Sequence, residues 1–131
     1  LPFLAGALER WLEEFPDTSS GLSRTERQML AAIARGAATV PELMTSAHAI
    51  DPRYPLTDVY AASVLRELVA AALINETATG FMITADGRAA LASNHDRVAA
   101  TGIDRWHGGV HFVGKGPMWR WETSERRVVW R

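Results

Sequence analysis

The chain has 131 residues, of which 47% are hydrophobic and 22% are charged, and its formal net charge is −1 at pH 7. This composition is typical of one folded domain and excludes a disordered chain. Cysteine is absent, which excludes disulfides, thiolate metal sites and a cysteine nucleophile, and fits a reducing cytoplasm. No apolar run reaches the roughly 20 residues that span a bilayer, so we expect no membrane partner.

Charge and tryptophan are unevenly distributed along the chain. Residues 1–94 contain 7 Lys or Arg and 11 Asp or Glu, a net charge of −4, whereas residues 95–131 contain 7 and 4, a net charge of +3. Four of the five tryptophans also lie in the second stretch. We therefore predict a helical body over residues 1–94 and a basic, Trp-rich β tail over residues 95–131, packed together as a single compact domain.

The first two predicted helices follow from spacing and capping signals. Apolar residues three and four apart predict a helix over residues 1–15, which Pro16 and the polar run after it end. Ser23 and Glu26 then form a capping-box pattern, in which each side chain can satisfy a backbone donor of the other. They open a second helix that stops at residue 36.

Two further helices follow in the same way. Thr39 and Glu42 form a second capping box and begin a short helix that ends near His48. Prolines then force an extended connection. Thr57 can cap the next helix, whose buried stripe runs to about residue 72. Counted from the helix at Ser23, this is the third helix of the body.

A two-stranded hairpin is predicted after the third helix. Residues 73–76 and 81–83 have strand patterns on either side of a turn at residues 77–80, and Thr84 caps one more short helix to about residue 94. The stretch 23–91 therefore resembles the winged helix-turn-helix superfamily, and "VLRELVAAALINETATGFMITADGRAAL" resembles the final helix, wing and following helix of bacterial members. Such domains bind DNA, RNA or proteins.

Period-two patterns in the tail predict strands. In each predicted strand, two apolar residues two positions apart share one face: Val110 and Phe112, Trp119 and Trp121, and Val128 and Trp130. With turns at residues 114–117 and 123–125, they predict a three-stranded antiparallel meander that has one aromatic face. The predicted fold class is therefore mainly α with a small β part (α+β), a winged-helix-type body followed by this meander.

A second resemblance covers nearly the whole chain. The segments "GIDRWHGGVHF…MWRW" and "GLSRTERQML" resemble the C-terminal region of an uncharacterised family of bacterial proteins, a domain of unknown function usually preceded by a small α/β domain. The resemblance implies a truncated bacterial cytoplasmic protein. The first residue is Leu1 and not Met, and no signal sequence follows it, which also favours a piece of a longer cytoplasmic protein. No catalytic residue follows from the resemblance, because the family has no established activity.

Tryptophans in the tail have two interpretations. Interleaved with arginine, they can form a stacking platform for unpaired bases. Large aromatic residues at period two more often belong to a core. We therefore expect Trp119 and Trp121 to fill the core between the meander and the first helix, where they would meet Trp11 and Phe15. We extend this interpretation to Trp106 and Trp130 on weaker grounds.

The outward face of the third helix is the first candidate site. It carries little charge and several apolar side chains, which is typical of the core of a protein interface. Its residues are Val59, Tyr60, Ser63, Arg66 and Glu67. We therefore expect a non-enzymatic interaction or regulatory module that contacts protein, either a missing N-terminal domain or a second copy.

Two alternatives remain open at this point. In a DNA-binding winged-helix domain of a transcription regulator, phosphates would be held by Arg66, Lys115, Arg120, Arg126 and Arg127. In a small-molecule sensor, a ligand loop would use Asp104, Arg105 and Trp106 beside Gly108 and Gly109. The structural interpretation of that last segment, which we favour, is a corner that joins helices to the meander.

No catalytic or metal-binding set emerges from the sequence. The only histidine clusters are His95 with Asp96, and His107 with His111, and a metal site needs three or four donors. Residues 114–117 lack the longer frame of a phosphate-binding loop. We therefore expect no catalytic residues, no metal site and no cofactor.

Overall fold

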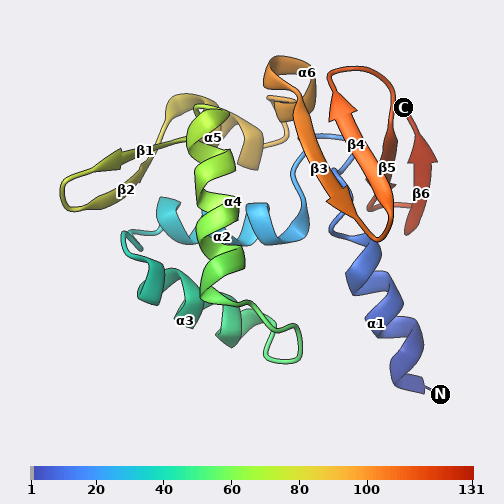
Figure 1. The fold of residues 1–131 in the computed structure, drawn as a ribbon, viewed down its shortest axis with the longest axis horizontal. Coiled ribbons are helices and arrows are strands. Elements are labelled where there is room, and N and C mark those ends of the chain that lie inside the picture. The colour runs from blue at the N-terminus through green and yellow to red at the C-terminus, as the bar shows by residue number, and fades with distance from the viewer. Residues whose placement is uncertain (1) are drawn as a thin grey trace. The chain divides into compact units, whose positions relative to one another are not determined.

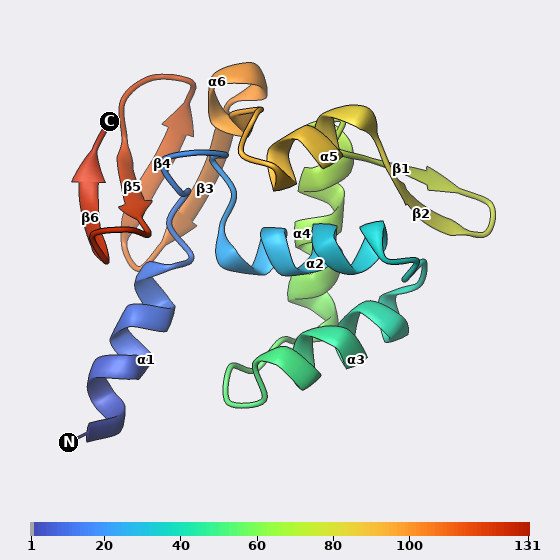
Figure 2. The same ribbon diagram turned by 180° about the vertical axis from the view of Figure 1, so that it is seen from behind.

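The computed structural model describes residues 2–131, which divide into two compact units. The central unit comprises residues 25–92 and the terminal unit comprises residues 2–24 together with 93–131. The fold is α+β, with six helices and three two-stranded antiparallel hairpins among the described residues (Figures 1 and 2). None of these helices has the length and apolar character that crossing a membrane requires.

The central unit has the predicted order of elements. Its elements are α2 (Arg24–Ala34), α3 (Val40–Ile50), α4 (Asp58–Ala70), β1 (Ile74–Thr77), β2 (Gly80–Ile83) and α5 (Ala85–Leu91). The predicted caps of the last three helices are present. Thr39 and Glu42 form a capping box at α3, Thr57 caps α4 through the N–H of Tyr60, and Thr84 caps α5.

Helix α4 supplies much of the core of the central unit. Its predicted inward stripe is buried as far as Leu68, and so are Leu30 of α2, Leu43 of α3 and Ile74 of β1. Ala72, the last predicted member of the stripe, is exposed because the helix ends at Ala70. The hairpin β1–β2 is joined to the turn between α2 and α3, because the N–H of Phe81 donates to the carbonyl of Ala38 over 2.9 Å. The outer face of α4 lies opposite this core.

The terminal unit joins the two ends of the chain. Its elements are α1 (Pro2–Leu12), α6 (Arg97–Thr101), β3 (Ile103–His107), β4 (Val110–Gly114), β5 (Trp119–Glu122) and β6 (Arg127–Trp130). Leu1, the first residue of the predicted opening helix, lies outside the described residues. The core of the unit contains Phe15, Val98, Ile103, Phe112, Met118 and Trp121.

The predicted three-stranded meander is wrong. Strands β3 and β4 form one hairpin and β5 and β6 form another, without pairing between β4 and β5. The reason is that both edges of β5 are occupied. One edge pairs with β6, and on the other the N–H of Trp121 donates to the carbonyl of Pro16, while the carbonyl of Trp121 accepts from the N–H of Thr18.

Only part of the expected tryptophan core is present. Trp121 is 5% exposed and packs in one cluster with Phe15, as predicted. Trp119 is 45% exposed and Trp130 is 59% exposed, and their rings meet edge to face at the open end of the β5–β6 hairpin. Trp106 is also exposed. The core prediction is therefore wrong for these three. Trp119 and Trp130 pack on each other at the end of their hairpin, and Trp106 packs on His111 on the outer face of the β3–β4 hairpin.

Candidate functional site

The outer face of α4 carries the first set of candidate residues. Val59 is 75% exposed, Tyr60 and Arg66 are exposed, and Ser63 and Glu67 are half-buried. They lie along the helix opposite the buried stripe, which contains Ala61, Val64, Leu65 and Leu68. Val69 lies on the flank of the helix, on the side opposite to Tyr60, and is 36% exposed. The outer face therefore presents Val59 and Tyr60 beside a single arginine.

Charge around this face does not favour a polyanion. Arg66 is the one Lys or Arg of α4, whereas Asp58 lies in its first turn. The central unit as a whole contains five Arg and seven Asp or Glu, a formal net charge of −2. Proteins that grip a duplex neutralise about 6–10 phosphates with Lys and Arg. The central unit lacks the cations for this.

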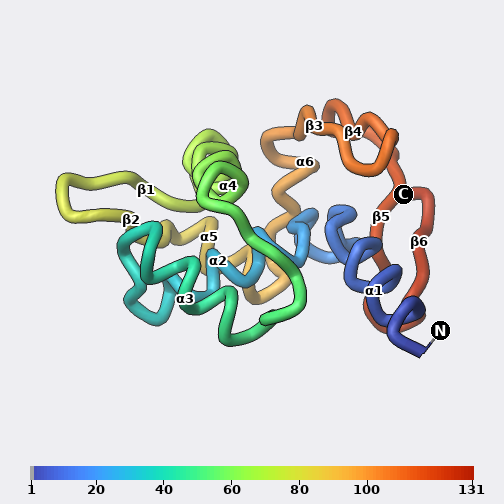
Figure 3. Tube along the Cα trace, turned by 60° about the horizontal axis from the view of Figure 1, so that its bottom comes forward, coloured from blue at the N-terminus to red at the C-terminus, as the bar shows by residue number. Residues whose placement is uncertain are grey.

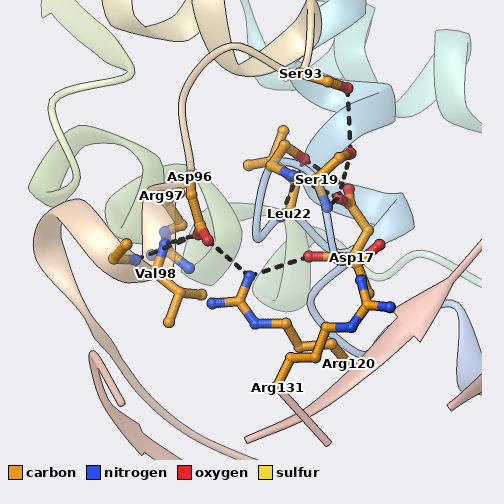
Figure 4. Close-up of polar contacts among 12 residues, drawn as sticks. Asp17, Ser19, Leu22, Ser93, Asp96, Arg97, Val98, Arg120 and Arg131 are labelled. Carbon is orange, nitrogen blue, oxygen red and sulfur yellow. Dashed lines mark hydrogen bonds and ion pairs between the residues drawn. The ribbon is translucent and has the colours of Figure 1, made fainter. Parts of the chain in front are cut away.

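Arg120 of the tail is buried and takes part in a polar network of the terminal unit (Figure 4). Its Nη1 donates to Oδ2 of Asp96 over 2.9 Å and to the carbonyl of Asp17 over 3.3 Å. The other carboxylate oxygen of Asp96 accepts the N–H groups of Val98 and Ala99 at the start of α6. Arg120 was predicted to contact phosphate, but its buried guanidinium group is directed into the terminal unit, which disfavours that role.

Arg126 and Arg127 lie on the surface in ion pairs. Arg126 pairs with Glu9 of α1, and Arg127 pairs with Glu125. The hydrogen bond between Arg126 and Glu9 lowers the pKa of the Glu9 carboxyl and raises the pKa of Arg126. Lys115 is exposed in the connection between β4 and β5. Residues 2–24 of the same unit contain two Arg and four Asp or Glu, which lowers the +3 of the tail to a formal net charge of +1 for the terminal unit.

Asp104 and Trp106 share the outer face of the β3–β4 hairpin with His111. Oδ1 of Asp104 lies 2.7 Å from Nε2 of His111, and the ring of His111 stacks on that of Trp106 with a centroid distance of 4.5 Å. Arg105 points to the other face and is half-buried. The interpretation as a corner is wrong. Residues 103–107 are a strand, and Gly108 and Gly109 form the hairpin turn.

His107 lies on the inner face of the same hairpin. Its Nε2 is 3.0 Å from the carbonyl oxygen of Trp11, and its ring packs against Trp11 and Phe15. His107 and His111 therefore face opposite sides of the hairpin. Among residues 2–131, no group of three or more His, Cys, Asp or Glu is arranged to hold a metal ion.

A pocket of about 360 Å³ lies in the central unit, where sequence reasoning placed no site. It is lined by Met44, Thr45 and His48 of α3 and by Tyr54 and Leu56 of the connection to α4. No periodicity signal marks it, because it arises where an irregular connection folds back over a helix.

Comparisons with protein-family models, with curated proteins and with solved structures found no match to this chain.

Proposed function

We propose that the chain is a non-enzymatic interaction or regulatory module of a bacterial cytoplasmic protein. Its central unit is of winged-helix type, and it contacts a protein partner through the outer face of α4. The order of α2, α3, α4 and the hairpin β1–β2 supports the winged-helix assignment. The partner is a domain outside this sequence or a second copy of the chain.

One observation carries this proposal. The helix that would enter the major groove in a DNA-binding member exposes Val59 and Tyr60 on its outer face and carries one cation, Arg66. Apolar and aromatic side chains with little charge are typical of interface cores. The burial of Arg120 supports the same choice, because its hydrogen bond to Asp96 directs one of the predicted phosphate contacts into the terminal unit.

Site-specific photo-crosslinking in the native host tests the proposal. A photoreactive phenylalanine analogue replaces Val59 in one variant, Arg66 in a second and Arg88 in a third. Arg88 is exposed on α5 and serves as the matched control. We expect one discrete protein adduct from positions 59 and 66 and none of that mass from position 88. Equal adducts at all three positions, or none, would contradict the α4 interface.

DNA binding is measured in parallel by fluorescence anisotropy with labelled duplex and single-stranded DNA across a salt series. We expect no salt-sensitive binding to the intact chain. Salt-sensitive binding that Arg66→Ala weakens would replace the protein partner by DNA. Binding that only Arg126→Ala with Arg127→Ala removes would instead assign nucleic-acid contact to the terminal unit.

A further inference from the structure

In the β5–β6 hairpin, the residue pairs that exchange backbone hydrogen bonds determine which backbone groups of β6 point away from β5. Met118 and Arg131 exchange two hydrogen bonds, of 2.8 and 3.0 Å. In an antiparallel pair such bonded positions alternate with non-bonded ones. The bonded pairs are therefore Arg120 with Val129 and Glu122 with Arg127. The N–H and C=O groups of Val128 and Trp130 point away from β5.

Independent contacts on the other side of β5 confirm this pattern of hydrogen bonds. Trp121 is opposite Val128 in the register, so its backbone groups must also point away from the hairpin partner. They do, because they bond to Pro16 and Thr18 on the far edge. The sheet thus runs from residues 16–18 through β5 to β6. In Figures 1 and 3, β6 is the outermost strand of the terminal unit on that side.

The open edge of β6 has a sequence suited to pairing. Residues 127–131 are Arg-Val-Val-Trp-Arg, without glycine or proline, and β-branched and aromatic residues favour strands. Val128 and Val129 are half-buried, whereas Trp130 is exposed beside Trp119. Natural proteins commonly cover or blunt such an edge, and an uncovered one is a template for another strand.

We propose that β6 binds an extended peptide segment of another protein by strand addition. The peptide donates to and accepts from the backbone of Val128 and Trp130. It places acidic residues opposite Arg127 and Arg131, with apolar residues opposite Val128 and Trp130. This surface belongs to the terminal unit and does not depend on the proposed role of α4. Main-chain bonds supply affinity in this mode, and alternate side chains supply specificity.

Charge decides between a peptide and a second copy. The symmetric register that overlaps the whole strand is centred on Val129 and places Arg127 of each copy opposite Arg131 of the other. Like charges directly opposite one another destabilise a strand pair. A peptide with carboxylates at both positions forms opposite-charge pairs instead. Arg127 and Arg131 now pair with Glu125 and Glu122, and the two arginine side chains are 64% and 61% exposed. Exchange of these partners costs little, because ion pairs of exposed arginines contribute little stability.

Fluorescence anisotropy with the intact chain and a labelled seven-residue peptide, Ser-Glu-Val-Thr-Val-Glu-Ser, tests the proposal. The pattern is symmetric about its threonine, which lies opposite Val129. Two control peptides separate the contribution of charge from that of the backbone hydrogen bonds. One replaces both glutamates with lysine, and the other carries N-methyl groups on both valines, which removes the donors that face β6. We expect each control to bind about tenfold more weakly or worse.

A matched pair of variants tests the edge itself. Trp130→Ala and Trp130→Pro both remove the indole ring, but only Trp130→Pro removes the outward N–H. Proline is tolerated on an edge strand where its N–H would face solvent, so the hairpin is retained. We expect the alanine variant to bind the acidic peptide and the proline variant to lose that binding. If the proline variant unfolds, the N-methylated peptide tests the same backbone hydrogen bonds with the wild-type chain.

Three results would overturn strand addition by a peptide. They are an absence of saturable binding, equal binding of the N-methylated peptide, and dimerisation in sedimentation that Trp130→Pro abolishes. The last result would assign the edge to a second copy. Crosslinks from position 59 report separately on α4, so one proposal can fail while the other stands.

Discussion

Arg120 of β5 donates a 2.9 Å hydrogen bond to Asp96, the residue that caps α6 through its other carboxylate oxygen. Arg120 is buried, whereas the side chain of Asp96 is about one-third exposed. The pair therefore ties the second hairpin to the start of a five-residue helix, which is too short to be stable alone. This contact accounts for a charged residue in the interior of the terminal unit.

Substitutions at Asp96 and Arg120 separate the ion pair from the helix cap. We expect Arg120→Ala to lower the free energy of unfolding of the terminal unit by about 1.5–3 kcal/mol, the range for hydrogen bonds to a charged group. Asp96→Asn keeps the capping oxygen and loses the charge. Asp96→Ala loses both and should cost about 1 kcal/mol more than Asp96→Asn.

Tryptophan fluorescence during urea unfolding measures these effects, because all five tryptophans lie in the terminal unit. They are Trp11, Trp106, Trp119, Trp121 and Trp130. Equal unfolding free energies for Asp96→Asn and Asp96→Ala would show that the cap of α6 adds nothing to the stability of the unit.

The turn between β3 and β4 packs directly on Trp11. A Cβ on Gly108 would lie 2.0 Å from Cζ2 of Trp11, whereas a Cβ on Gly109 would meet nothing within 4 Å. Both glycines have positive φ. We therefore expect both alanine variants to incur backbone strain of about 1–2 kcal/mol. Gly108→Ala should lose about 1–3 kcal/mol more, because it displaces the indole ring.

A double variant checks the cause of that difference. In a Trp11→Ala background the ring is gone, so Gly108→Ala and Gly109→Ala should destabilise the terminal unit equally. Urea unfolding followed by the remaining tryptophans gives the comparison. A persistent excess cost at position 108 would mean that contact with Trp11 is not its source.

Two tryptophans of β5 should differ sharply when truncated. Trp121→Ala removes a buried ring from the core cluster and should cost about 3–5 kcal/mol. Trp119→Ala removes an exposed ring that meets Trp130 edge to face and should cost about 0.5–1.5 kcal/mol. Thermal unfolding monitored by near-UV circular dichroism distinguishes the two. Similar costs would contradict the exposure of Trp119 in solution.

Acid should weaken the capping box of α3. The carboxylate of Glu42 accepts the N–H groups of Ala38 and Thr39, which lowers its pKa below the ordinary value of 4.5. Because the folded pKa lies below the unfolded one, the stabilisation is fully present above about pH 4.5 and is lost as the pH falls through the folded pKa.

The loss on acidification should be smaller in Glu42→Gln, which cannot titrate at this position. Far-UV circular dichroism during urea unfolding is measured at about pH 6 and about pH 3, where most of the helical signal comes from the four helices of the central unit. The difference in unfolding free energy between the two pH values is compared with that of the wild type. Glu76→Gln, an exposed carboxylate on β1, is the matched control. An unchanged pH dependence in Glu42→Gln would refute the role of this carboxylate.

The sequence alone determined the local structure of the central unit. Caps at Thr39, Thr57 and Thr84, together with helical and two-residue periodicities, predicted α3, α4, the hairpin β1–β2 and α5 in the right order. These signals are local, because a cap and an amphipathic stripe involve residues within a few positions of one another. Helix α6 was missed although Asp96 caps it, because its five residues are too few to show periodicity.

Only the tertiary structure decided how the tail is used. A two-residue periodicity of apolar side chains predicts a strand with two different faces. It does not predict which strand will pair with it or which face will be covered. Residues 16–18 pair with the edge of β5 that a meander would have needed, and Trp119 and Trp130 of the β5–β6 hairpin are exposed. Likewise, a count of arginines predicts a basic tail but not its ion pairs. Arg120 meets Asp96 because the tail folds back on itself, and Arg126 meets Glu9 because the chain brings its two ends together. Pairing of strands and of charges depends on contacts between residues far apart in sequence, and no local pattern records them.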